Sequence, residues 1–228
     1  LSGGAALNYG IILQPGTLTV NKATVLATAN NQTRLYGVAN PALTISYTGF
    51  VNSETASVLD ALPVTATAAT PLSGVGSYPI SISGGSDNNY TLTYANGTLS
   101  ITKSTLTATA VNASRLYGSA NPAFVVNIAG FRNGENQSVI DALPVATSAT
   151  TLTSIVGSYS ITVSGGTDNN YTFTYTPATL TISKAPLIAT AANASRPYGT
   201  SNPAFIINYS GFVNSETSTV LDTAPIAS

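Results

Sequence analysis

Hydrophobic and polar residues alternate along much of the chain. The alternation is clear in residues 43–47 and 78–82, and it returns in residues 124–128 and 159–163. A period of two puts every second side chain on one face, which predicts β-strands with one buried face. The Thr, Val, Ile and Tyr residues of these segments suit such a surface. Further strands are predicted at Thr24–Ala29, Val64–Ala68, Tyr90–Tyr94 and Thr98–Thr102.

Residues 53–62 depart from the alternation. Their large apolar residues would share one face of a helix, Ser53 is a candidate N-cap, and Glu54 suits the positive end of the helix dipole. Pro63 would end the helix. The pattern therefore predicts one short helix in an otherwise β-rich region.

The whole pattern recurs every 81 residues without an insertion, and Lys22, Lys103 and Lys184 open successive copies. Such self-similarity decides the architecture before any single residue does. The recurring motifs are Arg34-Leu35-Tyr36-Gly37, Arg115-Leu116-Tyr117-Gly118 and Arg196-Pro197-Tyr198-Gly199, then Asn40-Pro41, Asn121-Pro122 and Asn202-Pro203, then Gly49-Phe50, Gly130-Phe131 and Gly211-Phe212.

The repeat predicts the domain organisation. Residues 22–102 and 103–183 are complete repeats, residues 1–21 are the C-terminal part of a preceding repeat, and residues 184–228 are the N-terminal part of a following one. We expect the natural chain to continue in both directions. The predicted fold is mostly β with one short helix per repeat, as tandem Ig-like β-sandwich domains in an elongated array. A sheet wrapped around the helix is the alternative.

Composition limits the possible functions. Charged residues are 7% of the chain and the net charge is −1, which argues against a nucleic-acid partner. No apolar run approaches the length of a membrane span. His and Cys are absent, which removes the commonest general base, nucleophile and zinc ligands. With Met also absent, the composition favours an extracellular protein without enzymatic activity, metal or cofactor.

Nearly all charged residues recur in the repeats, Arg132 being the exception. A charge kept in every copy is more typical of domain structure than of a single active site. Arg34 is predicted to form an ion pair with Glu54 or Asp60, or to clamp backbone carbonyls; contact with a ligand is the alternative. The full set of structural charge candidates is Arg34, Arg115, Arg196, Glu54, Glu135, Asp60 and Asp141.

Asn-x-Ser/Thr sequences are candidate glycan acceptors. Asn31, Asn112 and Asn193 keep the acceptor pattern at one position of the repeat although the neighbouring residues vary. The alternative is an Asn turn beside a Ser/Thr hydrogen bond. Asn89 and Asn170 are further glycosylation candidates, and the pattern also occurs at Asn96, Asn136 and Asn208.

Two other motifs leave alternatives open. Asp87-Asn88-Asn89-Tyr90 offers oxygen ligands for calcium, but one carboxylate among amides is a thin ligand set, and the alternative is an Asx turn entering a strand. The three recurring lysines are candidates for a covalent cross-link to an Asn side chain. A catalytic carboxylate pair is also conceivable, although Glu54 and Asp60 would not share one helical face.

The motifs in combination resemble the MBG ("mostly beta, glycine-rich") repeats of large bacterial surface proteins, in particular the type named for its Tyr-Gly-x motif. The resemblance covers essentially the whole chain, with Ala178 departing from the pattern where the first repeat has Gly97. It implies a secreted, adhesin-like repeat protein without enzymatic activity and without assigned binding residues. In the first repeat it further rests on Gly76-Ser77-Tyr78, Ser83-Gly84-Gly85, Asn89-Tyr90 and Gly97-Thr98-Leu99.

The sequence therefore predicts a structural fibre or stalk whose partners are neighbouring repeats and, where sequons are used, covalent glycans. The alternative is a multivalent adhesin module in which each repeat binds carbohydrate weakly and the array supplies avidity. A binder should keep an exposed aromatic or polar cluster in every copy, whereas a spacer should keep mainly Gly, Pro and core positions.

Overall fold

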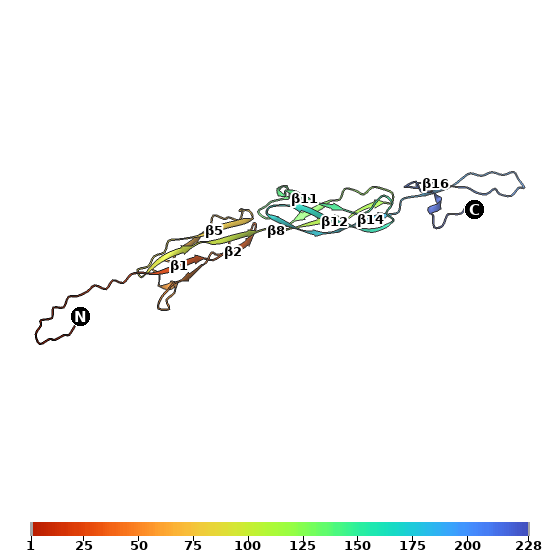
Figure 1. The fold of residues 1–228 in the computed structure, drawn as a ribbon. Coiled ribbons are helices and arrows are strands. Elements are labelled where there is room, and N and C mark those ends of the chain that lie inside the picture. Colours follow the sequence, from red (N-terminus) through yellow and green to blue (C-terminus); the bar gives the residue numbers. More distant parts are fainter. Residues whose placement is uncertain (1, 228) are drawn as a thin grey trace. The chain divides into compact units, whose positions relative to one another are not determined.

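The structure is a computed structural model that describes residues 2–227. The chain divides into two compact units, Leu1–Thr102 and Lys103–Ser228. β-Strands predominate in both units, and the described residues contain three short 3-10 helices but no α-helix. Figure 1 labels some of the strands of each unit.

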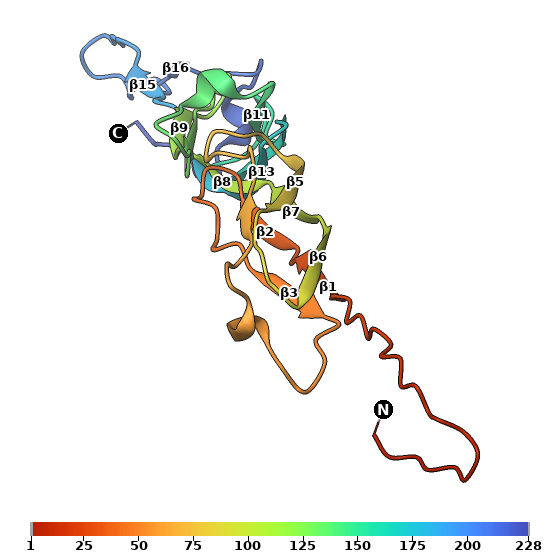
Figure 2. The same cartoon turned by 90° about the vertical axis from the view of Figure 1, so that its left-hand side faces the viewer.

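The first unit contains seven strands in two sheets. The three-stranded sheet has the order β3-β1-β6, with β1 antiparallel to β3 and parallel to β6; these strands lie side by side in Figure 2. The four-stranded sheet has the order β2-β7-β5-β4, with β2 parallel to β7. The strands are β1 Ala23–Ala29, β2 Gln32–Leu35, β3 Ile45–Thr48, β4 Val64–Ala66, β5 Gly76–Ser83, β6 Tyr90–Ala95 and β7 Gly97–Thr102, and η1 is Ala56–Val58.

The second unit repeats this topology and adds a two-stranded sheet. Its sheets have the orders β10-β8-β13, β11-β12-β14-β9 and β15-β16. The last pair belongs to the partial repeat. The elements are β8 Ser104–Ala110, β9 Ala113–Leu116, β10 Val126–Ala129, η2 Gln137–Val139, β11 Ala142–Thr147, β12 Gly157–Thr167, β13 Tyr171–Thr176, β14 Ala178–Ser183, β15 Ile188–Ala191, β16 Ile207–Ser210 and η3 Ser218–Val220.

The predicted alternation places the core. Val25, Ile80 and Leu99 are fully buried, and neighbouring residues along their strands are exposed or half-buried. In the second unit, Ile161 and Leu180 from one sheet share a cluster with alanines of β8 from the other. The two sheets of a complete repeat therefore bury one common core, as the period-two pattern requires.

The Gly-Phe motif marks a close approach of two backbone segments. Gly49 has φ +103°, and a Cβ placed on it would lie 2.5 Å from the carbonyl oxygen of Thr24. Gly130 has a similar φ of +105°, and its Cβ would lie 3.0 Å from the Thr105 oxygen. Both the conformation and the space exclude a side chain, so the motif recurs for a steric reason.

The predicted helix over residues 53–62 is wrong. The segment holds only η1, whose N-cap is Thr55, and Asn52 and Ser53 instead adopt left-handed conformations with φ of +56° and +62°. Ala61 forms an antiparallel β-bridge with Ser86. Pairing with another part of the chain therefore overrides the local helical pattern, which is a weak signal over so few residues.

A second difference concerns the Arg-Leu part of the first motif. No strand is predicted there from the sequence, but Gln32–Leu35 is β2, a strand that pairs in parallel with β7. Its residues are largely polar and too few for a clear alternation, so no pattern in the sequence distinguishes this strand from a loop. The glycosylation candidate Asn31 immediately precedes β2.

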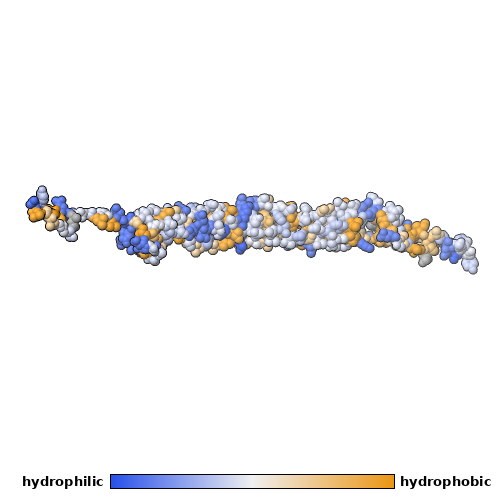
Figure 3. All heavy atoms as spheres, turned by 60° about the horizontal axis from the view of Figure 1, so that its bottom comes forward, coloured by the Kyte–Doolittle hydropathy of each residue, from blue (hydrophilic) through white to orange (hydrophobic). Residues whose placement is uncertain are grey.

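On the face of the molecule drawn in Figure 3, the complete repeats are mostly of intermediate hydropathy, with separate polar and apolar areas. Most of the face shown in Figure 3 is pale, which is the colour of residues with intermediate hydropathy. This agrees with a chain in which only 7% of residues are charged. Within residues 2–227, no helix has the length and apolar character needed to cross a membrane.

Candidate functional site

The most elaborate polar contact of the repeat is a clamp formed by Arg34 on β2. Arg34 is only 6% exposed. Its Nε donates to Asn40 Oδ1 at 2.7 Å, Nη1 to the Leu35 carbonyl at 3.0 Å, and Nη2 to the Thr70 carbonyl at 2.5 Å. Asn40 in turn donates to the Ala69 carbonyl at 2.6 Å. The guanidinium therefore ties the Asn-Pro loop and the loop before β5 to β2.

The second repeat builds the same clamp. Arg115 donates to Asn121 Oδ1 at 2.7 Å and to the Thr151 carbonyl at 2.5 Å. In the partial repeat, Arg196 is exposed and keeps the bond to Asn202 Oδ1 at 2.6 Å.

Of the two intramolecular roles expected for Arg34, the structure shows the carbonyl clamp and not the ion pair. The guanidinium binds carbonyl and amide oxygens, whereas Glu54 hydrogen-bonds a tyrosine, and Asp60 and Asp141 are exposed. The sequence alone did not identify Asn40 as a partner. The available signal was that the Asn-Pro motif follows the arginine at the same spacing in all three copies.

Asp87 forms an Asx turn at the start of β6. One carboxylate oxygen, Oδ1, accepts hydrogen bonds from Asn89 N at 2.7 Å and Tyr90 N at 2.8 Å. Asp168 makes the equivalent bonds at the same two distances. This is the turn alternative for the Asp-Asn-Asn motif. Among the residues that the structure describes, no cluster of three or more acidic side chains could hold a metal ion.

The recurring lysines contact the same turns. Lys22 Nζ donates to the Asp87 carbonyl at 2.8 Å, and Lys103 Nζ donates to the Asp168 carbonyl at 2.7 Å. These hydrogen bonds give both lysines a non-covalent role at a backbone carbonyl, where a cross-link would have needed an Asn side chain.

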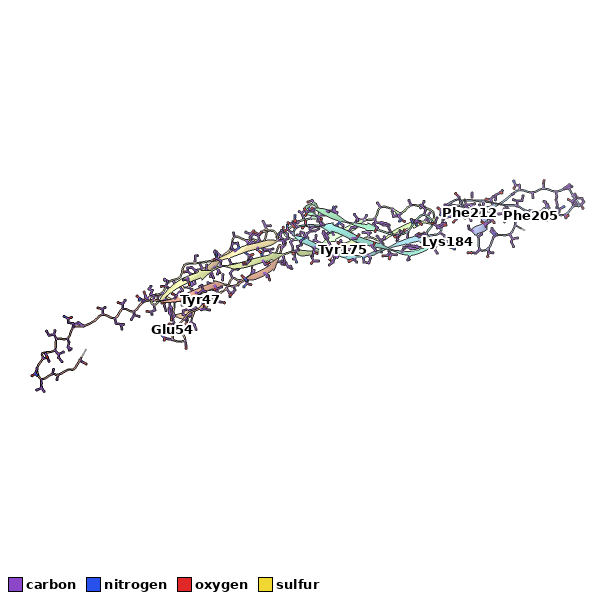
Figure 4. All side chains as sticks on the ribbon, in the orientation of Figure 1. Tyr47, Glu54, Tyr175, Lys184, Phe205 and Phe212 are labelled. Atoms are coloured by element: carbon purple, nitrogen blue, oxygen red, sulfur yellow. The ribbon has the colours of Figure 1, made fainter. Side chains whose placement is uncertain are left out.

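Glu54 tethers its loop to the core through a tyrosine. The Tyr90 hydroxyl donates to Glu54 Oε2 at 2.5 Å and accepts from Val51 N at 3.1 Å. The ring of Tyr90 packs edge-on against Phe50, with centroids 5.2 Å apart and an interplanar angle of 78°. Figure 4 shows Glu54 and Tyr47 in this unit. The Gly-Phe motif and the glutamate therefore act together on one buried tyrosine.

The second repeat has an equivalent tether. The Tyr171 hydroxyl donates to Glu135 Oε2 at 2.6 Å and accepts from Arg132 N at 2.8 Å. Phe131 packs edge-on against Tyr171. Arg132, the one basic residue that does not recur, thus contributes its backbone to a contact that does recur.

The tether predicts an alkaline loss of stability. The hydrogen bond to Glu54, followed by burial, raises the pKa of Tyr90 in the folded state above its ordinary value of about 10. The stabilising contribution is therefore complete below the unfolded pKa and is lost as pH rises through the folded pKa. We expect unfolding of the first unit, followed by hydrogen exchange, to become easier above pH ~10.

Tyr90→Phe should remove this part of the pH dependence. Tyr94→Phe is the matched control, because Tyr94 is exposed and its hydroxyl donates to the Gly84 carbonyl rather than to a carboxylate. An identical alkaline loss in wild type and Tyr90→Phe would contradict the tether.

The glycosylation candidates lie at the surface. Asn31 Oδ1 accepts from Thr98 N at 2.8 Å, and Asn112 Oδ1 accepts from Thr179 N at 2.8 Å. A glycan is joined to the amide nitrogen, so these bonds to the oxygen are compatible with modification. Asn31, Asn112, Asn193 and Asn89 are exposed, and Asn170 is half-buried.

Hydrogen bonding is complete for the buried side chains in the part of the chain that the structure describes. Every buried side-chain nitrogen and oxygen there has a hydrogen-bond partner. The Gly97 position, where the second repeat has Ala178, lacks a left-handed backbone in both repeats. A close approach to Ala29 accounts for the glycine, because a Cβ on Gly97 would lie 2.5 Å from the Ala29 carbonyl oxygen.

These features define a class of protein, a tandem array of β-rich repeats whose recurring polar residues support each repeat from within. The chain belongs to the MBG domain family of the YGX type, whose model matches residues 25–100, 106–181 and 187–228. A search of curated proteins found no match to the chain.

Proposed function

We propose that the chain is part of an extracellular bacterial surface protein in which tandem repeats form a long, stiff fibre or stalk. In this proposal each complete repeat is an Ig-like β-sandwich, the repeats follow one another in an elongated array, and none performs catalysis. Neighbouring repeats are the principal partners of each domain.

The observation that carries the proposal is the use of two recurring charged positions, those of Arg34 and Asp87. Arg34 and Asp87 are 6% and 8% exposed and bind atoms of their own repeat. Arg115 and Asp168 do the same in the next repeat. Selection for a common ligand site would retain groups that face the solvent, whereas these residues maintain the fold.

Composition supports the environment of the proposed stalk. The chain lacks Cys and Met, and its surface relies on Thr, Ser, Asn and Gly rather than on charge. The absence of sulfur side chains removes the sites of thiol and thioether oxidation. Glycans on Asn31 and Asn112 would add further protection at loops between strands.

A second candidate is a multivalent carbohydrate-binding adhesin. It is favoured by Tyr94 and Tyr175, which occupy the same position of the two complete repeats and are 41% and 43% exposed. Exposed aromatic faces suit sugar rings, and an array of weak sites would gain avidity. Figure 4 shows Tyr175 on the second unit.

Electron microscopy of the intact native protein tests the stalk. We expect thin rods of uniform width, and mass spectrometry of the same sample should show hexose-containing adducts where sequons are used. Flexible strings or compact particles would contradict the stalk. Binding on a glycan array at sub-millimolar strength that is lost in the Tyr94→Ala, Tyr175→Ala variant would favour the adhesin instead.

A further inference from the structure

The second unit contains a contact between consecutive repeats. The Tyr117 hydroxyl, in the Tyr-Gly motif of the second repeat, donates to Glu216 Oε1 in the loop of the partial repeat. Asn214 of the same loop donates from Nδ2 to the Leu152 carbonyl at 3.3 Å. A neutral donor on a carboxylate is a strong hydrogen bond, so the contact links the two repeats at a defined point.

The backbone of the motif fits closely against the same loop. A Cβ placed on Gly118 would lie 2.4 Å from Val213 Cγ2, and Gly118 has φ +77°. Only glycine meets both requirements at this position. At Gly199, the equivalent glycine of the partial repeat, a Cβ would meet no atom within 4 Å.

The solvent exposure of equivalent residues in the turn and in the loop differs between the copies of the repeat. Tyr117 is half-buried, whereas the equivalent Tyr198 is fully exposed. On the other side, Val213 is half-buried, whereas the equivalent Val51 in the first unit is 48% exposed. Tyr117 and Val213 are therefore partly covered where the turn and the loop meet, whereas Tyr198 and Val51 are open.

The loop has the same shape with and without this contact. Asn214 and Ser215 have φ of +54° and +62°, and Asn52 and Ser53 in the first unit have φ of +56° and +62°. The receiving surface is thus formed before the turn packs on it, which reduces the conformational cost of docking.

A hollow at the start of the repeat accompanies the loop. In the partial repeat it measures about 270 Å³ and is lined by Tyr117, Lys184, Phe212 and Glu216 among others. Lys184 and Phe212 are labelled in Figure 4. The first unit has a hollow of about 250 Å³ at the equivalent position, lined by Lys22 and Glu54 among others.

We propose that the Tyr117-Gly118 turn and the Val213–Glu216 loop form a specific docking joint whose partner is another copy of the same repeat. The joint orders the start of one repeat against the end of the previous one. It deepens the proposed stalk by naming the surface that couples its repeats, although the contact itself holds for any array of these domains.

Segment-resolved hydrogen exchange of the 228-residue chain tests the joint. Tyr117→Phe and Glu216→Ala should each reduce the protection of β15 and β16 by about tenfold, the scale of one hydrogen bond to a charged group. Because both remove the same bond, the double variant should lose little more than either single variant. Protection of β12 and β14 should not change.

Tyr198→Phe is the matched control, because this tyrosine has the same place in the motif and no loop covers it; it should leave protection unchanged. Unchanged protection in both single variants, or effects that multiply in the double variant, would overturn the joint. Neither result depends on whether the native protein is a rod in micrographs, so failure of the joint and failure of the stalk are distinguishable.

Discussion

Replacing Arg34 with Met is expected to lower the free energy of unfolding of the first unit by about 2–4 kcal/mol. The methionine keeps part of the aliphatic stem, but it removes three donors from a site that is only 6% exposed. The Thr70 carbonyl and the Asn40 side chain then lose charge-assisted hydrogen bonds. Hydrogen exchange of β2, β5 and β7 in a urea series provides the measurement.

The partial repeat supplies the control for this prediction. Arg196→Met replaces the same residue of the motif at an exposed position that lacks the long-range carbonyl partner. We expect a change within about 0.5 kcal/mol, as for most surface substitutions. An Arg34→Met effect as small as that of Arg196→Met would show that the clamp does not stabilise the repeat.

Replacing Leu99 with Ala is expected to destabilise the first unit by about 2–5 kcal/mol, because the substitution removes buried methyl groups and leaves a cavity. Leu99 is fully buried on β7. A domain of about 80 residues has a total stability of roughly 4–12 kcal/mol, so this loss is a large share of it. The midpoint of urea unfolding, resolved by segment, measures the effect.

Leu18→Ala is the matched control for the core. Leu18 occupies the same position of the repeat pattern as Leu99, but it is 88% exposed. The same chemical change should therefore have no measurable effect there. Equal effects at the two leucines would mean that position in the motif, rather than burial, determines stability.

These predictions separate two contributions to the repeat. Leu99 acts through apolar burial, which a period-two pattern in the sequence already identifies. Arg34 acts through directional hydrogen bonds, one of them to the Thr70 carbonyl 36 residues away along the chain, and local patterns carry no information about such a partner. The recurrence of Arg34 and Asn40 at fixed spacing was the only indication that they act together.

Strands that show a local pattern were predicted correctly, whereas segments that depend on a distant partner were not. The strands β1, β5, β6 and β7 lie where the alternation predicts them. By contrast, the short β2 was missed and the helix over residues 53–62 was wrong. Both errors concern segments whose conformation depends on a distant partner, namely β7 for β2 and Ser86 for Ala61.

The candidate site shows more clearly what could not be predicted from the sequence. That Arg34, Glu54 and Asp87 support each repeat could be inferred, because a residue kept in every copy is more often structural. Which atoms they bind could not be inferred. Glu54 receives a hydrogen bond from Tyr90 rather than from Arg34, because β6 places the tyrosine hydroxyl under the loop.

The sequence by itself determined the tandem repeat, its period, the β-rich character and the family of this protein, because periodic patterns and spacing are properties of the chain alone. Only the tertiary structure decided the pairing of parallel strands, the bond from Arg34 to the Thr70 carbonyl, the bond from Tyr90 to Glu54, and the contact between Tyr117 and Glu216. Those features depend on residues separated by 36 to 99 positions. Folding brings such residues together, and no local propensity encodes their meeting.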